Sequence, residues 1–174
     1  MIYIIPIFII VPLILMAIMI LIPLKIGQKM PPAFTNEKSE IFDIAKDKLY
    51  QLITNYENYP LWIKYLSFVN TEKLENERLK IMQTYKKKNI YQEYYELKRV
   101  ENERATILKL ENEYTVLWSY ILTSIDETKT KLTIKETMYV YHPYLKFILK
   151  YILKDENAKK DFLKKIREKI KNDK

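Results

Sequence analysis

The sequence VLWSYILTSIDETKTKLTIKETMYV, residues 116–140, contains two alternating runs separated by a short polar turn. In Thr115–Ile125 and Lys131–Val140, apolar side chains recur with a period of two, which is the period of a β-strand with one buried face. Asp126–Thr128 supplies turn-forming residues between the two runs. Because so short a connection brings the runs side by side, this stretch predicts an antiparallel β-hairpin.

Four more strands are predicted before this hairpin. Segments rich in Tyr, Thr, Ile and Val alternate there with polar breaks such as Glu101–Glu103 and Glu111–Glu113. Because the breaks are short, consecutive strands should pair as antiparallel neighbours. The predicted strands are Phe68–Leu74, Arg78–Tyr85, Ile90–Val100 and Arg104–Leu110.

Helical patterns flank these strands. Glu40–Ile44 favours a short strand, Asp47–Thr54 has helical spacing, and Pro60 is typical of the first turn of a second short helix. After His142-Pro143, one apolar stripe predicts a long amphipathic C-terminal helix that is weakest at Asp155–Asn157. The stripe consists of Leu145, Leu149, Ile152, Leu163, Ile166 and Ile170. An open, curved antiparallel sheet can bury such a helix in its concave face, so the predicted fold class is α+β.

The N-terminus has a different character. Residues 1–24 contain no charged side chain, and a helix of that length is long enough to cross a hydrocarbon core of about 30 Å. A cleaved signal peptide is the alternative, but it would have a basic first region and a cleavage site flanked by small residues, and neither is present. We therefore predict an uncleaved transmembrane anchor over residues 1–24, a linker over 25–37 and a folded domain over 38–174.

The charge distribution suggests how the anchor is oriented. Lys25 and Lys29 follow the apolar run directly, and the positive-inside rule then places the domain in the cytoplasm of a single-pass membrane protein. The net charge of +8 would also attract the domain to anionic lipids. The bilayer is thus one expected partner.

The composition excludes several classes of site. The chain has no cysteine and one histidine, so it cannot form a disulfide, a thiolate nucleophile or a site of several histidines. Its one glycine, Gly27, rules out glycine-rich loops that bind phosphate or dinucleotides. No metal or cofactor is expected, and the lack of a catalytic constellation weighs against an enzyme.

The order of elements resembles the START-like helix-grip superfamily, in the SRPBCC branch of polyketide cyclases/dehydrases and lipid-transport proteins. FDIAKDKLYQLITNYENYPLWIKYLSFV is similar to the opening strand, helix pair and Tyr-x-x-Tyr-Pro-x-Trp turn of that family. The hairpin at 116–140 is similar to its last hairpin, and HPYLKFILKYI with FLKKI to its C-terminal helix. The likeness covers about residues 38–170, although relatives usually have glycines in the last hairpin.

The resemblance implies a sheet that grips the helix around a cavity for an apolar ligand. Trp118 and Tyr120 lie in phase with Val116 and Leu122 on the more apolar side of their strand, where core packing or a pocket wall is expected. Glu136 shares the phase of Leu132, Ile134 and Met138. It could act as an acid or a ligand hydrogen-bond partner, but the favoured interpretation is a structural carboxylate satisfied by a neighbouring Tyr or Lys.

Three further cavity candidates are weaker. Glu93 and Tyr95 share one phase of their strand, but the opposite phase is equally apolar, so the pattern does not assign Glu93 to a face. Trp62, on the second short helix, is placed near the cavity mouth, with packing favoured over gating. The C-terminal lysines are mixed with acidic residues and favour a solvated face, so no nucleic-acid partner is expected.

Three functions remain open at this point. The preferred hypothesis is a membrane-tethered binding module that carries, sequesters or senses a hydrophobic small molecule or lipid. The second is a cyclase or dehydratase that uses Glu136 with a tyrosine as an acid–base pair. The third is a structural or regulatory membrane protein whose interior is filled by its own side chains. The sequence indicates no oligomeric state.

Overall fold

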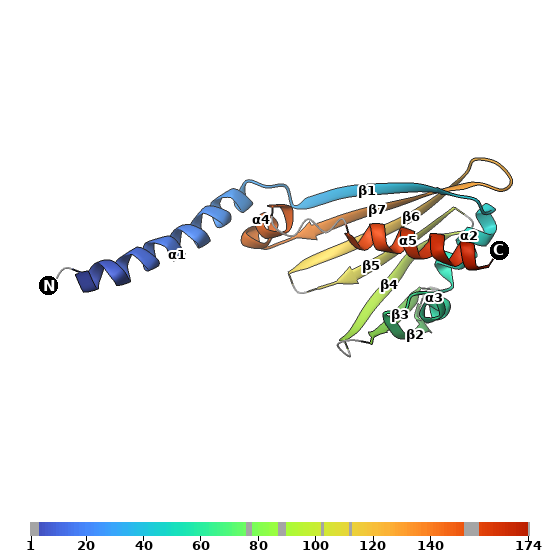
Figure 1. Ribbon diagram of the computed structural model, residues 1–174, viewed down its shortest axis with the longest axis horizontal. Coiled ribbons are helices and arrows are strands. Elements are labelled where there is room, and N and C mark those ends of the chain that lie inside the picture. The colour runs from blue at the N-terminus through green and yellow to red at the C-terminus, as the bar shows by residue number, and fades with distance from the viewer. Residues whose placement is uncertain are drawn as a thin grey trace.

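The computed structural model of the protein describes residues 4–75, 78–86, 90–101, 103–111, 113–151 and 157–173. The helices are α1 (Ile4–Gln28), α2 (Lys46–Thr54), η1 (Tyr56–Asn58), α3 (Tyr59–Trp62), α4 (Pro143–Tyr151) and α5 (Asn157–Asn172). The strands are β1 (Ala33–Phe42), β2 (Leu66–Lys73), β3 (Leu79–Tyr85), β4 (Ile90–Val100), β5 (Arg104–Leu110), β6 (Tyr114–Ser124) and β7 (Thr130–Val140). Figure 1 shows α1 extending away from a sheet that the other helices flank.

The strands form a seven-stranded sheet in the order β1-β7-β6-β5-β4-β3-β2. From β2 to β7 each strand pairs antiparallel with its neighbour in sequence, and β1 joins the free edge of β7. The hairpin predicted at 116–140 is present, and it places Trp118 opposite Glu136. The predicted α+β class with an open antiparallel sheet is confirmed.

Helix α5 lies across one face of this sheet (Figure 1). Its apolar stripe, Leu163, Ile166 and Ile170, is buried in a core that also contains Leu132 and Ile134 of β7. The stripe spacing of three and four residues keeps these side chains on one helix face. The lysines of α5 other than Lys159 lie on its remaining faces.

The helices α2, η1 and α3 close one end of the sheet. Leu49 and Ile53 of α2 are fully buried, and so is Tyr56 of η1. The hydroxyl of Tyr59 donates a hydrogen bond to the carbonyl of Ile53 at 2.7 Å, which ties α3 to α2. This corner of the core therefore depends on aromatic side chains that also have a polar partner.

The predicted linker over residues 25–37 is wrong for most of its length. Helix α1 continues to Gln28, and β1 begins at Ala33 and pairs with β7 from Tyr139 inward. The strand predicted at Glu40–Ile44 is thus the end of a longer one. The less exposed positions of β1 include Lys38 and Glu40, so its sequence lacks the apolar alternation that marks a half-buried strand.

The predicted C-terminal helix under the sheet is present as α5, but it is shorter than predicted, because residues 143–151 form a separate helix, α4. Two helices, α4 and α5, are present, and only α5 lies on the sheet. Helix α4 packs against the end of α1 instead (Figure 1). Ile152 and the predicted weak point at Asp155–Glu156 lie outside the described residues.

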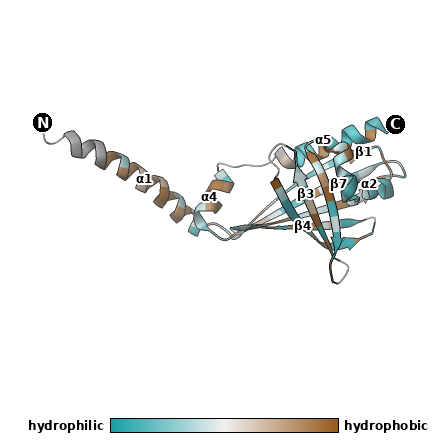
Figure 2. Ribbon diagram, turned by 90° about the horizontal axis from the view of Figure 1, so that it is seen from below, coloured by the Kyte–Doolittle hydropathy of each residue, from teal (hydrophilic) through white to brown (hydrophobic). Residues whose placement is uncertain are grey.

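Most of the coloured part of α1 in Figure 2 is hydrophobic, with hydrophilic residues near its C-terminal end. Among the described residues, one helix is long and apolar enough to cross a membrane, over Ile10–Gln28. Its side chains from Ile10 to Ile22 are exposed in the isolated chain. Burial of so large an apolar surface requires an environment outside the domain.

Candidate functional site

A cavity that is partly open to solvent lies between α5 and the sheet; we call it the inner or interior cavity. Its volume is about 160 Å³. The walls come from α3 and the segment after it, from β3 to β7, and from the first turns of α5. Prominent among the lining residues are Ile107, Ile134, Tyr94, Trp118, Tyr120 and Phe162.

Aromatic rings occupy much of the space under α5. The ring centroids of Tyr94 and Trp118 lie 5.9 Å apart, and those of Tyr120 and Phe162 lie 5.6 Å apart. Such tilted ring pairs are favourable beyond the area they bury. Two of the sequence-predicted residues, Trp118 and Tyr120, therefore line the cavity and pack in the core at the same time.

One end of the cavity is polar. Glu136 accepts a hydrogen bond from Trp118 Nε1 at 3.0 Å and one from Asn36 Nδ2 at 3.2 Å. Its other partner is the ammonium of Lys159, which forms an ion pair with Oε2. Glu136 and Lys159 are only 8% and 5% exposed. A buried carboxylate with three donors is charge-compensated, as burial of an ionised pair requires.

Lys159 was not predicted from the sequence. It lies four residues before Leu163, on the apolar stripe of α5, and it lines the cavity. A lysine within an otherwise apolar stripe was the available signal, because lysines are rarely buried without a partner. The structure supplies that partner from β7.

The tyrosine hydroxyls add polar groups to the same interior. Tyr85 and Tyr94 are hydrogen-bonded through their hydroxyls at 3.2 Å, and Tyr94 also donates to Gln92. Burial raises the pKa of Tyr94 and of Tyr120, so both hydroxyls stay protonated at neutral pH. They act as hydrogen-bond donors and not as bases.

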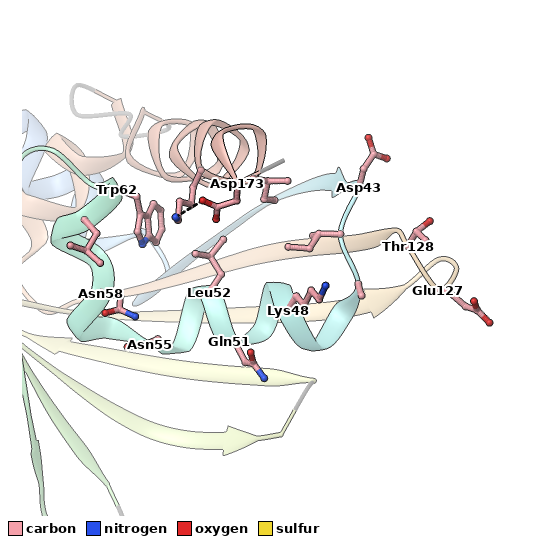
Figure 3. A pocket seen from close by; sticks show the side chains of 15 residues that line it. Asp43, Lys48, Gln51, Leu52, Asn55, Asn58, Trp62, Glu127, Thr128 and Asp173 are labelled. Atoms are coloured by element: carbon pink, nitrogen blue, oxygen red, sulfur yellow. Dashed lines mark hydrogen bonds and ion pairs between the residues drawn. The ribbon is translucent and has the colours of Figure 1, made fainter.

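Trp62 separates this cavity from a second hollow. The outer cleft, about 650 Å³ in volume, lies between α2, α3, the β6–β7 turn and the end of α5 (Figure 3). The ring of Trp62 borders this cleft and packs on Tyr59 and Phe162, at centroid distances of 5.1 and 5.9 Å. Because Tyr59 and Phe162 line the inner cavity, we call these three residues the aromatic partition.

The outer cleft is the more polar of the two. Its lining includes Lys48, Gln51, Asn55 and Glu127, together with the ion pair between Lys169 and Asp173 at 2.6 Å (Figure 3). The inner cavity has the larger apolar share of lining, as sites for apolar ligands usually do. The inner cavity is therefore the better candidate site.

No protein-family model and no curated protein matches this sequence. Solved structures do match in three dimensions. A START superfamily protein from Mycobacterium smegmatis superposes with a TM-score of 0.61 at 9% identity, over 80% of this chain and 99% of that one. The chain has the START-like helix-grip fold.

Two other helix-grip structures show how widely the fold is used. Norcoclaurine synthase from Thalictrum flavum, in complex with dopamine and hydroxybenzaldehyde, gives a TM-score of 0.64 at 6% identity, over 82% of this chain and 88% of that one. The di-domain ARO/CYC protein StfQ from the steffimycin biosynthetic pathway superposes with a TM-score of 0.59 at 10% sequence identity. The match covers 78% of this chain and 49% of that one. This chain thus spans about half the length of the di-domain protein. At such identities the likeness establishes the fold alone.

Glu93 and Tyr95 do not line the cavity of this helix-grip domain. They lie on the opposite face of β4 from Tyr94, because side chains alternate along a strand. Glu93 forms an ion pair with Lys80 at 2.7 Å and accepts hydrogen bonds from Tyr91 and Tyr95. The hydrogen bonds from Lys80 and Tyr91 lower the pKa of Glu93, which stays ionised on the outer surface.

Glu96, on the inner face of β4, is a second buried carboxylate that the sequence analysis missed. It accepts a hydrogen bond from the Tyr56 hydroxyl and two from Arg99, at 2.7 and 2.8 Å. It does not line the cavity, so its role is to hold η1 against the sheet. Among the described residues, no group of three or more His, Cys, Asp or Glu is placed to hold a metal ion.

Proposed function

We propose that this protein is a membrane-anchored helix-grip domain that binds a small hydrophobic molecule between α5 and the sheet. The observation that carries the proposal is the interior cavity with aromatic walls and a single polar end. Ligand sites commonly combine an apolar lining with a few placed polar groups in this way. The ammonium of Lys159, which has three donor hydrogens, and the hydroxyl of Tyr120 are polar groups that could orient a ligand, and the ring of Trp118 could pack on it.

The cavity volume limits the ligand. A protein cavity of about 150 Å³ accommodates benzene, whereas sites for drug-sized ligands start at about 300 Å³. The volume of about 160 Å³ fits a single ring or a short branched chain. A longer lipid or isoprenoid would fit only if the aromatic partition moved and joined the cavity to the outer cleft.

The contacts of Glu136 favour binding over catalysis. A general acid or base must lie within hydrogen-bond reach of the proton that it exchanges with a ligand, and Glu136 is not among the residues that line the cavity. Among the described residues, the donors to Glu136 are Asn36, Trp118 and Lys159. The carboxylate is therefore better placed to fix Lys159 and Trp118 in position than to exchange a proton with a ligand.

We further propose that α1 is the membrane anchor and that the domain lies in the cytoplasm. The exposed apolar side chains of α1 support the first part, and Lys25 and Lys29 after the span support the second. The chain lacks cysteine, so a cysteine introduced at Leu61, on exposed α3, is a specific label site. An impermeant thiol reagent should label Leu61→Cys from the cytoplasmic side only, and labelling from the other side would contradict the orientation.

The ligand proposal is tested by a pair of variants on β5. Ile107 points into the cavity, whereas Leu110, three residues later, is exposed on the other face. Ile107→Trp should fill the cavity and abolish the retention of hydrophobic molecules. Leu110→Trp adds a similar ring outside and should leave retention unchanged. Mass spectrometry of molecules released from the purified full-length proteins measures both.

Two results would contradict the proposal. One is that the wild-type protein releases no hydrophobic molecule beyond the lipids that a bare transmembrane helix retains. The other is that Ile107→Trp unfolds the domain by overpacking, which costs about 1–3 kcal/mol where no space exists. Either would favour a packed domain with a structural or regulatory role.

A further inference from the structure

Helix α4 lies apart from the sheet, beside the end of α1 (Figure 1, Figure 2). The buried positions at this end of α1 are Pro23, Gly27 and Met30, which share one side of the helix. Lys146 of α4 donates a hydrogen bond to the carbonyl of Met30 at 3.4 Å. The two helices therefore meet where the apolar run ends.

The contact depends on the one glycine of the chain. A Cβ atom on Gly27 would lie 1.8 Å from the carbonyl oxygen of Pro143. Such a distance is far below van der Waals contact, so any larger residue would push α4 away from α1. Glycine thus allows the backbones of the two helices to touch.

The apolar face of α4 is only partly covered, because its leucine and isoleucine side chains are half-buried in the isolated chain. Pro143 and Lys146 face α1, and at 100° per residue Leu145, Ile148 and Leu149 lie on the other side of the helix. No residue of α4 is fully buried. Tyrosines flank this face, and Tyr141 and Tyr151 are 64% and 52% exposed.

The charged side chains of α1 and α4 are all positive. Helices α1 and α4 contain no acidic residue. Near the contact between Gly27 and Pro143, the first segment has Lys25 and Lys29, and the second has Lys146 and Lys150. Residues 4–24 form about 31 Å of helix, which is the thickness of a hydrocarbon core. The contact between Gly27 and Pro143 would then lie at the level of the lipid headgroups.

We infer that α4 is an interfacial helix that lies in the surface of the bilayer beside the anchor. Its apolar face would enter the boundary between headgroups and acyl chains, with its tyrosines at that boundary and its lysines among anionic headgroups. The inference rests on the proposed anchoring role of α1. An interfacial α4 would attach the domain to the membrane at a second point. The start of α5, at Asn157, lies toward the same end of the sheet as α1 (Figure 1).

Single-cysteine variants of the full-length protein test this inference, since the natural chain has no cysteine. Leu15→Cys reports on α1, Ile148→Cys on α4 and Leu61→Cys on α3, where the side chain is 80% exposed. Each carries an environment-sensitive fluorophore in vesicles of phosphatidylcholine and phosphatidylglycerol. Nitroxide lipids labelled near the headgroup or near the chain terminus then report the depth of each fluorophore.

The label at Ile148 should be quenched several-fold more by the shallow nitroxide than by the deep one. The label at Leu15 should be quenched mainly by the deep nitroxide, and that at Leu61 by neither. If Leu15 is quenched and Ile148 behaves like Leu61, the anchor stands and the interfacial helix is wrong. If Leu15 is not quenched either, the anchor itself is wrong and the inference fails with it. If Ile148→Cys disturbs the fold, Leu149→Cys carries the fluorophore instead, and the same quenching measurement is made on it.

Discussion

Replacement of Lys159 by methionine should destabilise the domain by about 3–5 kcal/mol, because it leaves a buried carboxylate without its counter-ion. Glu136 would retain its hydrogen bonds from Trp118 and Asn36, but neither donor carries a charge. Methionine keeps most of the apolar stem of lysine, so the loss reflects the ammonium group. Chemical unfolding of the purified full-length protein, followed by near-ultraviolet circular dichroism, measures the change.

A double variant separates the ion pair from simple packing. In Lys159→Met with Glu136→Gln, both charges are gone, and neutral replacement of a buried pair often restores stability. Most of the lost free energy of unfolding should return. Lys164→Met, on the exposed face of the same helix, is the control. If Lys159→Met costs no more than Lys164→Met, the pair is not buried and the polar end of the cavity is misassigned.

The second large effect is expected at the contact between α5 and the sheet. Ile166 is 0% exposed and lies in the middle of the apolar stripe that α5 turns to the core. Ile166→Ala should lower the free energy of unfolding by about 2–5 kcal/mol, through lost burial and the hole it leaves. Because α5 covers the cavity, retention of a bound hydrophobic molecule should fall as well.

The matched control for this change is Ile125→Ala, which removes the same atoms at the β6–β7 turn. Ile125 is exposed, so its truncation should change stability by no more than about 0.5 kcal/mol. Equal effects at the two sites would show that α5 does not grip the sheet. Both free energies come from the same unfolding measurements.

The strands were predictable because one face of the sheet is buried and the other is not. The predicted bounds of β4 and β5 agree with the structure, and those of β6 and β7 differ by one residue. Alternation is a local signal in such strands, and it also brought Trp118 and Glu136 to the same face. The edge strand β1 has charged residues, Lys38 and Glu40, at half-buried positions and carries no such signal.

The split of the C-terminal helix was not predictable from its stripe. Leu145 and Leu149 continue the spacing of Leu163 and Ile166, yet the first pair lies on the side of α4 turned away from α1, and the second pair is buried against the sheet. Periodicity gives the apolar face of a helix but not the surface that covers it. The contact of α4 with α1 depends on Gly27, which lies more than a hundred residues earlier in the sequence.

The site was predicted only on the strand side. The alternation along β6 and β7 placed Trp118, Tyr120 and Glu136 on the inner face of the sheet. Lys159 and Phe162 belong to α5, and only the packing of that helix on the sheet brings them to the cavity. Glu93 and Glu96 lie on opposite faces of one strand, and both phases of that strand contain tyrosines. Their partners distinguish them. Glu93 pairs with Lys80 on the outer face, and Glu96 pairs with Arg99 and Tyr56 on the inner face.

The central claim, that the space under α5 is a ligand site, is tested most directly by methyl NMR of the full-length protein in lipid nanodiscs. Isotope-labelled isoleucines report on Ile81, Ile107 and Ile134 in the cavity wall, and on Ile53 and Ile166 elsewhere in the core. Titration with indole, a small apolar molecule with one polar group, should shift the three cavity signals saturably and leave the other two in place. Cavity signals that do not move, or that move no more than Ile53 and Ile166, would contradict the account.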